Sequence, residues 1–192
     1  MPGDRRKGKA MQLSSNPTTR QTQLTAIKTY VEANHSVNGS GVYDQSTADA
    51  MNALASVPLP FWVWKSNANP EDTGMAVDLS EVGGLTTANS SRLQVSFQIR
   101  PNGFTPSKQS DRALFGSVFS AAGGVITRTA IIALFQRKAT IAEKVLATGV
   151  GTQAVGLNTD GSNTSGSPAI LGDSAEGEIT LPNLIEAAGV SP

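Results

Sequence analysis

The chain lacks cysteine altogether, and this absence excludes disulfides, thiolate metal sites and cysteine nucleophiles. It holds one histidine, His35, so metal sites built from several histidines are excluded and a Ser/His/Asp triad would depend on this residue. Fifteen basic residues are matched by fifteen acidic ones. A net charge that would gather nucleic acid or anionic lipid is therefore missing, and any such binding has to be local.

Long apolar runs are also missing. No stretch approaches the roughly 18 residues that a membrane-spanning helix needs, and no apolar segment of a secretory signal follows the charged N-terminus. A chain of 192 residues can bury one ordinary hydrophobic core. Roughly a quarter of it is too polar and glycine-rich to join such a core. We expect a soluble, non-secreted protein of one domain with extensions and no membrane contact.

Residues 1–21 are predicted to form a basic, flexible arm, because proline, glycine and serine surround its charges. Its basic residues are Arg5, Arg6, Lys7 and Lys9. Two interpretations stay open: a solvated tail, or an arm that contacts phosphates or lies between protein subunits. A second methionine, Met11, leaves open whether residues 1–10 are natively translated.

Helical periodicity dominates residues 22–148, which we interpret as a helical body. Helices are predicted over 23–33, 44–55, 108–122, from Thr127 onward and over 140–147. Thr140 and Glu143 have the spacing of a capping box. A single helix over 127–148 is the competing interpretation.

Two segments of this body allow two interpretations. Residues 85–99 alternate between apolar and polar side chains from Leu93 to Ile99, which favours a strand, while a helix entered at Thr86 or Thr87 is the alternative. The run Phe61–Trp64 is predicted to pack in the core. A base-stacking platform is the other interpretation, but only one basic residue lies nearby in the sequence.

Residues 149–178 are predicted to form a Gly/Ser/Thr-rich extension. Apolar side chains are scattered there, and such a stretch cannot offset its ordering entropy by itself. Residues 179–192 are predicted as a terminal docking segment that opens with Pro182 in the first turn of a brief helix. Leu184 and Ile185 would dock this helix on the body or on another chain.

No motif has the spacing of a catalytic or cofactor site. ATGVGT at 147–152 follows a predicted helix instead of a strand and lacks the lysine of a phosphate-binding loop. The carboxylates and amides of 158–178 do not have the spacing of a calcium-binding loop. Glu143 and Arg137 are interpreted as a solvated ion pair. We expect no catalytic residue, no cofactor and no bound metal.

Six short motifs follow one another in order beyond residue 20. They are ADAMNA at 48–53, VWK at 63–65, LTTANSSRLQVSF at 85–97, RKATIAEKVLATGVGT at 137–152, SPAIL at 167–171 and GEIT at 177–180. This order resembles a family of small, mostly uncharacterised proteins encoded by tailed bacteriophages and prophages. RKATIAEKVLATGVGT is the most specific of the motifs. The stretch AVGLNTDGSNTSG, ahead of SPAIL, is longer than the family pattern.

The resemblance implies a multi-helical fold, a helix over 85–99, a gene from the virion-assembly region and no catalytic residues. We therefore expect a mainly α protein: a small multi-helical domain with an extended N-terminal basic arm, a Gly/Ser/Thr-rich C-terminal arm and room for a minor β element. The expected function is that of a non-enzymatic structural protein of the virion. A head-to-tail connector subunit, an adaptor or neck protein, is the first choice.

Several alternatives to the connector remain. Capsid decoration or a tail structural protein belongs to the same class. A small DNA-binding regulator would use a helix carrying Arg128, Arg137 and Lys138. A hydrolase would require His35.

The expected partners follow from the connector hypothesis. They are portal, capsid or tail subunits, further copies in a homo-oligomeric ring, and packaged DNA through the basic arm. The protein would be located in the virion, after assembly in the host cytoplasm. The predicted partner-binding residues are Arg5, Arg6, Lys7, Lys9, Leu184 and Ile185.

Overall fold

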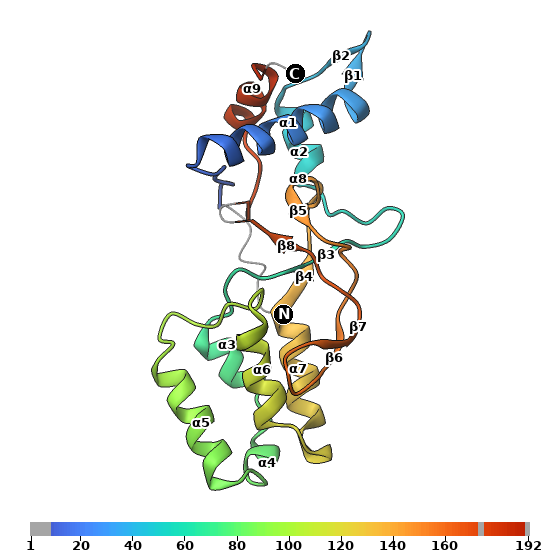
Figure 1. Cartoon of the computed structure of the whole chain (residues 1–192). Helices are drawn as coiled ribbons and strands as arrows, with labels where there is room; N and C mark the ends of the chain where they lie inside the picture. Colours follow the sequence, from blue (N-terminus) through green and yellow to red (C-terminus); the bar gives the residue numbers. More distant parts are fainter. Residues whose placement is uncertain (1–8, 173–174, 191–192) are drawn as a thin grey trace. The chain divides into compact units, whose positions relative to one another are not determined.

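The computed structural model describes residues 9–172 and 175–190 of the chain. Within these residues α-helices dominate, and the short strands pair two by two (Figure 1). The prediction of a mainly α protein is thereby confirmed. The described residues form two compact units. Unit 1 holds residues 9–61, 138–148, 170–172 and 175–190, and unit 2 holds 62–137 and 149–169. The predicted helical body is thus divided between the units, and the predicted extension contributes to both.

Unit 1 is built around a long helix, α1 (Pro17–Asn34). The Asn16 side chain accepts a hydrogen bond from the Thr19 N–H at 3.1 Å, and Pro17 suits the first helical position because its missing N–H is not needed there. The remaining elements are β1 (Ser36–Val37), β2 (Ser40–Gly41), α2 (Gln45–Asn52), α8 (Ile141–Leu146), β5 (Ala147–Thr148), β8 (Ile170–Leu171) and α9 (Leu181–Ala188). Strands β1 and β2 form a hairpin, and β5 pairs antiparallel with β8.

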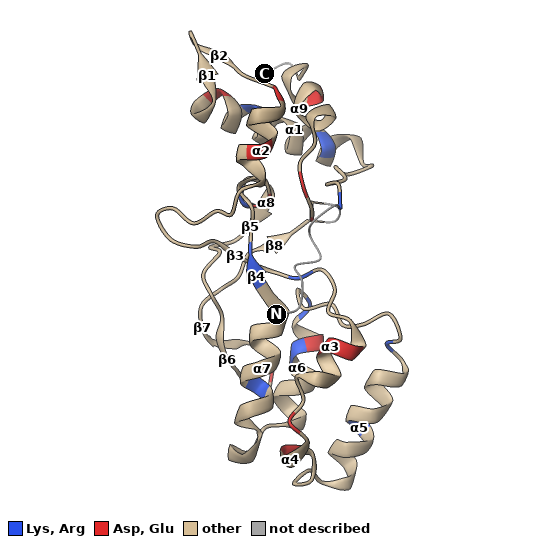
Figure 2. Ribbon diagram, turned by 180° about the vertical axis from the view of Figure 1, so that it is seen from behind, with Lys and Arg blue, Asp and Glu red and all other residues tan. Residues whose placement is uncertain are grey.

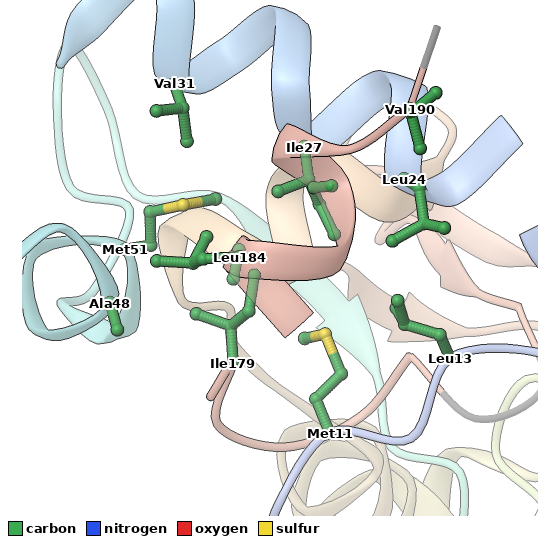
Figure 3. Close-up of a cluster of buried hydrophobic side chains, with 12 residues drawn as sticks. Met11, Leu13, Leu24, Ile27, Val31, Ala48, Met51, Ile179, Leu184 and Val190 are labelled. Carbon is green, nitrogen blue, oxygen red and sulfur yellow. The ribbon is translucent and has the colours of Figure 1, made fainter. Parts of the chain in front are cut away.

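The core of unit 1 joins both ends of the described chain to its middle (Figure 3). Its buried residues are Met11, Leu13, Leu24, Ile27, Val31, Ala48, Met51, Ala142, Ile179, Leu184, Ala187 and Val190. The Met11 N–H donates to the Glu178 carbonyl at 2.7 Å, and the Glu178 N–H donates to the Lys9 carbonyl at 2.9 Å. Residues 9–21 are therefore packed and paired where the sequence predicts a flexible arm, because Met11 and Leu13 supply the apolar anchors.

Unit 2 is a small helical assembly with a two-stranded hairpin on α7. Its elements are β3 (Trp62–Trp64), α3 (Pro70–Met75), α4 (Leu79–Val82), α5 (Thr87–Gln98), α6 (Gln109–Val118), the 3-10 turn η1 (Ala122–Gly124), α7 (Val125–Phe135), the start of β4 (Gln136–Lys138), β6 (Val155–Leu157) and β7 (Asn163–Ser165). Phe104 lies at its centre, with ring centroids 5.1 Å from Phe97 and 5.2 Å from Phe115. Both contacts are edge-to-face, the geometry that aromatic quadrupoles favour.

Residues 87–98 form a helix, so the strand interpretation is wrong. The Thr86 side chain accepts a hydrogen bond from the Asn89 N–H at 3.2 Å and caps the helix. Leu93 and Phe97, four residues apart, pack against the unit 2 core, whereas Ile99 is 67% exposed. The residues that alternate along the sequence therefore do not share one buried face. The residues four positions apart do, as a helix requires.

The start of α7 also differs from the prediction. The helix begins at Val125, and Thr127 is a buried residue inside it instead of its cap. The Glu81 carboxylate of α4 accepts hydrogen bonds from the N–H groups of Ile126 and Thr127, both at 2.8 Å. A carboxylate 45 residues away in sequence from Ile126 thus satisfies the free donors at this helix N-terminus.

The segment after α7 settles two further predictions. Strand β4 separates α7 from α8, so a single helix over 127–148 is wrong. The capping box of Thr140 and Glu143 is confirmed. Glu143 is fully buried, however, and its carboxylate accepts hydrogen bonds from the N–H groups of Thr140 and Gly177 at 2.9 and 3.1 Å. The prediction that the Glu143 carboxylate is solvated is therefore wrong.

The Gly/Ser/Thr-rich segment packs on unit 2 through its backbone. The buried Gln136 amide donates to the Ala154 carbonyl at 2.8 Å and accepts from the Ala154 N–H at 2.7 Å. The buried Arg112 guanidinium donates from Nε to the Gly161 carbonyl at 2.9 Å. Ala154 and Leu157 are buried in the same core. Side chains of Gln136 and Arg112 thus bond to backbone groups of residues 154–161 and hold this stretch in place.

We expect Glu81→Gln to weaken unit 2 by about 1 kcal/mol, because it weakens the cap of α7. Burial acts to raise the pKa of Glu81, but hydrogen bonds from Thr127 and Ile126 outweigh it and leave the pKa below the ordinary 4.5. The stabilisation is present above pH 4.5 and is lost as the pH falls through the lowered pKa. Urea unfolding at several pH values measures this, and an equal loss of stability in the wild-type and variant proteins as the pH falls below 4.5 would contradict it.

Gln136→Leu is expected to cost about 2 to 4 kcal/mol, because it leaves both backbone groups of Ala154 buried without their partner. Gln153→Leu, at an exposed position of the same segment, is the matched control and is expected to change the stability by less than about 0.5 kcal/mol. Thermal unfolding followed by circular dichroism compares the two. Equal effects would show that the Gln136 amide does not anchor the segment.

Candidate interaction surfaces

An apolar loop projects from unit 1 between α2 and β3 (Figure 1). It covers residues 53–61, and its tip carries two of the most exposed apolar side chains in the described structure, Val57 at 82% and Leu59 at 76% exposure. Helix α2 starts at the predicted cap, Asp44, but ends at Asn52 instead of reaching residue 55. The apolar residues that we expected at the end of this helix therefore lie in a loop.

The base of this loop is held by backbone hydrogen bonds. Ala55 and Phe61 bond to opposite sides of Ala139, through Ala55 N–H to Ala139 O at 2.9 Å and Ala139 N–H to Phe61 O at 2.8 Å. The Phe61 N–H also closes the loop on the Ala55 carbonyl at 2.9 Å. Pro58 and Pro60 restrict the tip between these anchors. The loop is therefore held in place at its base while its apolar tip faces solvent.

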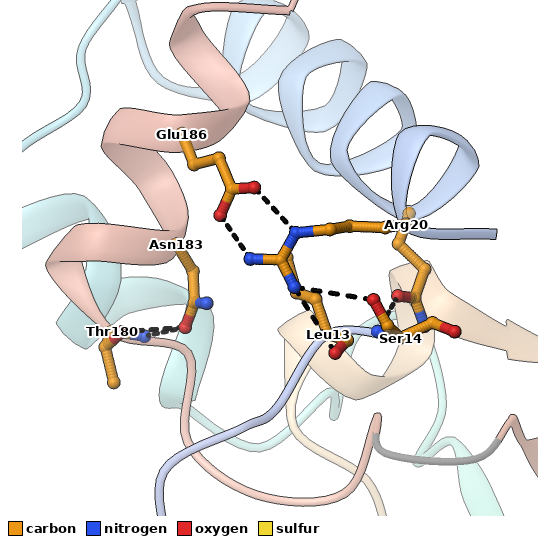
Figure 4. A network of polar contacts seen from close by, with 7 residues as sticks. Leu13, Ser14, Arg20, Thr180, Asn183 and Glu186 are labelled. Atoms are coloured by element: carbon orange, nitrogen blue, oxygen red, sulfur yellow. Dashed lines mark hydrogen bonds and ion pairs between the residues drawn. The ribbon is translucent and has the colours of Figure 1, made fainter. Parts of the chain in front are cut away.

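Helix α9 packs on α1 of its own chain. Leu184 is fully buried in the unit 1 core, so its side chain contacts this chain, whereas Ile185 is 59% exposed and free to meet another molecule. Glu186 accepts two hydrogen bonds from Arg20, at 2.6 and 2.5 Å (Figure 4). The hydrogen bond from Arg20 lowers the pKa of Glu186. About a third or more of each side chain in this pair is exposed, so it orients α9 more than it stabilises it.

Residues 1–8 of the predicted basic arm lie outside the described residues. This applies to Arg5, Arg6 and Lys7. Lys9 is described, and it is exposed next to the paired backbone of residues 9–11 and 177–178. Its position leaves the ammonium available to a partner.

The structure also shows where the residues lie on which the DNA-binding, hydrolase and base-stacking interpretations depend. Arg128 lies on α7, but Arg137 and Lys138 lie in β4, so the recognition helix required for a DNA-binding regulator is not formed by these three residues. His35 ends α1, with its ring 5.9 Å from that of Tyr30. Val63 and Trp64 are buried, which confirms core packing for this pair.

A hollow of about 620 Å³ lies between α7 and the β6–β7 hairpin of unit 2. Its charged groups already bond within the chain: Arg128 donates to the Ser120 carbonyl at 3.0 Å, and Asp160 accepts from the Ser162 N–H at 2.9 Å. The Ser162 hydroxyl and N–H lower the pKa of Asp160. Hydroxyl groups make up most of the remaining polar lining, so the hollow offers no grouping of acid, base and nucleophile.

Three or more metal-ligating side chains do not gather anywhere in residues 9–172 and 175–190. Asp173, one of the carboxylates considered from the sequence, lies outside these residues. None of the described helices is both long and apolar enough to cross a membrane. Comparison with protein-family models, with curated proteins and with solved structures found no match for this chain.

The neighbouring residues Leu184 and Ile185 allow a matched test of α9. We expect Leu184→Ala to destabilise unit 1 by about 3 kcal/mol, because it opens a cavity in the core. Ile185→Ala, one position further along and exposed, is expected to change stability by less than about 0.5 kcal/mol. Denaturant unfolding distinguishes the two. If Ile185→Ala proved as damaging as Leu184→Ala, the described packing of α9 would be wrong.

Proposed function

We propose that this protein is a non-enzymatic structural subunit of a tailed-bacteriophage particle and acts by binding neighbouring protein subunits. A head-to-tail connector subunit is the first choice. The observation that carries the binding role is the anchored loop 53–61 with Val57 and Leu59 exposed at its tip. The phage context rests on the resemblance of RKATIAEKVLATGVGT and the accompanying motifs to proteins of tailed phages.

The chemistry of the loop favours a protein partner over nucleic acid or lipid headgroups. No charged side chain occurs between Asp49 and Lys65, so the loop itself carries no charge that would bind a phosphate. An apolar tip gains free energy only by leaving water, which a complementary apolar surface on another protein provides. Because its base is already bonded, the loop loses little conformational freedom when it binds.

The fold of unit 1 supports the same role. Residues 9–13, α1 and α9 pack together around one core, so the chain ends of the described structure are fixed to the unit that carries the loop. An assembly subunit requires such a rigid base, because movement at the base would lower the affinity of a surface loop. Exposed Ile185 and Lys9 add further positions at which a partner can be contacted.

Mass spectrometry of gradient-purified particles tests the proposal directly. The protein is expected in particles of the phage or prophage whose genome carries the gene, in constant ratio to the major capsid protein across the gradient. Its absence from intact particles would refute a virion role.

The loop variant Val57→Ser/Leu59→Ser tests how the protein binds. It is expected to reduce incorporation into particles about tenfold or more, the effect of losing roughly 1.4 kcal/mol or more of contact free energy. Val37→Ser, at another exposed apolar residue of unit 1, is the matched control and should be incorporated normally. Normal incorporation of the loop variant would show that the tip is not the binding surface.

A further inference from the structure

We infer that Asn38 is a site of spontaneous deamidation, at which the chain converts its own linkage between Asn38 and Gly39 into an aspartyl or isoaspartyl one. The reaction needs no enzyme and takes water as its only co-reactant. It is independent of the proposed function, because it depends on one turn of unit 1 and on no partner.

Asparagine followed by glycine is the pair that undergoes this reaction most readily. The backbone nitrogen of Gly39 attacks the side-chain Cγ of Asn38, a C–N bond forms, and the amide nitrogen of Asn38 leaves as ammonia. Water then opens the succinimide ring at either carbonyl, which gives aspartate or isoaspartate. Glycine favours the attack because it has no Cβ to obstruct the approach or to restrict the backbone.

Asn38 and Gly39 form the tip of the β1–β2 hairpin, which is labelled in Figure 1 and mapped in its negative and positive charges in Figure 2. Their φ angles are 52° and 82°, the left-handed values that a two-residue hairpin turn requires. Residues 36–40 are all exposed. Among the described residues, none beyond its chain neighbours places an atom within 4 Å of where a Cβ on Gly39 would lie. The reacting groups are therefore open to water.

The hairpin is also short enough to open at its tip. Each of its strands has two residues, and a two-stranded hairpin of this kind is marginally stable in water. Its base is held, because the Val42 N–H donates to the His35 carbonyl at 2.7 Å. Opening therefore stays local, and Asn38 can rotate toward the Gly39 nitrogen without disturbing the core of unit 1.

The second Asn-Gly pair of the chain, Asn102 and Gly103, is held closed. The Gly103 N–H donates to the Arg100 carbonyl at 3.0 Å, so the nitrogen that would attack is already bonded. The next residue, Phe104, is fully buried and exchanges two backbone hydrogen bonds with Ala68, at 2.8 and 2.9 Å. Release of this turn thus disrupts the centre of unit 2, whereas the tip of the β1–β2 hairpin opens alone.

The product changes unit 1 in two ways. Loss of the amide adds a negative charge at the hairpin tip. Isoaspartate also adds a methylene group to the backbone, which no longer fits the two-residue turn that pairs Val37 with Ser40. We expect the backbone amides of β1 and β2 to exchange faster with solvent in the isoaspartyl form.

Peptide mapping of the full-length protein by mass spectrometry, after ageing in mildly alkaline buffer, tests the inference. Conversion of the amide to an acid raises the mass of the peptide that contains Asn38. In the folded protein Asn38 is expected to convert at least about tenfold faster than Asn102, because release of Gly103 requires the costlier local opening. In concentrated urea both turns are unfolded, and the difference should largely disappear.

Asn38→Gln and Asn102→Gln are the matched variants, since both positions are exposed. Glutamine would have to close a larger ring, which forms far more slowly. Isoaspartate is detected by methyl transfer from S-adenosylmethionine with an isoaspartate methyltransferase. Asn38→Gln is expected to lose most of this methyl acceptance, and Asn102→Gln should keep it.

Circular dichroism checks that both variants are folded. An unchanged mass at Asn38, equal conversion of Asn38 and Asn102 in the folded protein, or methyl acceptance that survives in Asn38→Gln would each overturn the inference.

Discussion

Hydrogen bonds between buried side chains and backbone groups hold the Gly/Ser/Thr-rich segment of this protein in place. Gln136 satisfies both groups of Ala154, Arg112 binds the Gly161 carbonyl, and Glu143 accepts the N–H groups of Thr140 and Gly177. The segment 149–178 has too few apolar side chains to order itself. In residues 149–172 and 175–178 the backbone is held because Gln136, Arg112 and Glu143 provide buried partners that are costly to leave unpaired.

This constraint shapes how the protein can act. The core of unit 1 fixes the elements that carry the exposed loop 53–61. The base of this loop is bonded through the backbone of Ala55, Phe61 and Ala139, while Val57 and Leu59 at its tip are exposed. Binding through such a loop would require little reordering, which fits the proposed role of a structural subunit.

The sequence predicted local features well wherever the signal was local. Asp44 starts α2, Thr140 and Glu143 form a capping box, and Pro182 lies in the first turn of α9, as their spacing indicates. The predictions from the sequence were wrong where a residue distant in sequence forms the deciding hydrogen bond. Glu81 caps α7 from another helix and so removes any need for Thr127 to do so, while Glu143 looked exposed because its partner Gly177 lies 34 residues away in sequence.

The sequence by itself determined the helical class, most helix starts and the uncharged run from residue 50 to 64, because propensity, capping and charge are properties of neighbouring residues. Only the tertiary structure decided which apolar residues stay in solvent. Leu184 and Ile185 are adjacent and similar, yet one is buried and the other is exposed. The same holds for the loop tip, because burial depends on what the rest of the chain brings to each position.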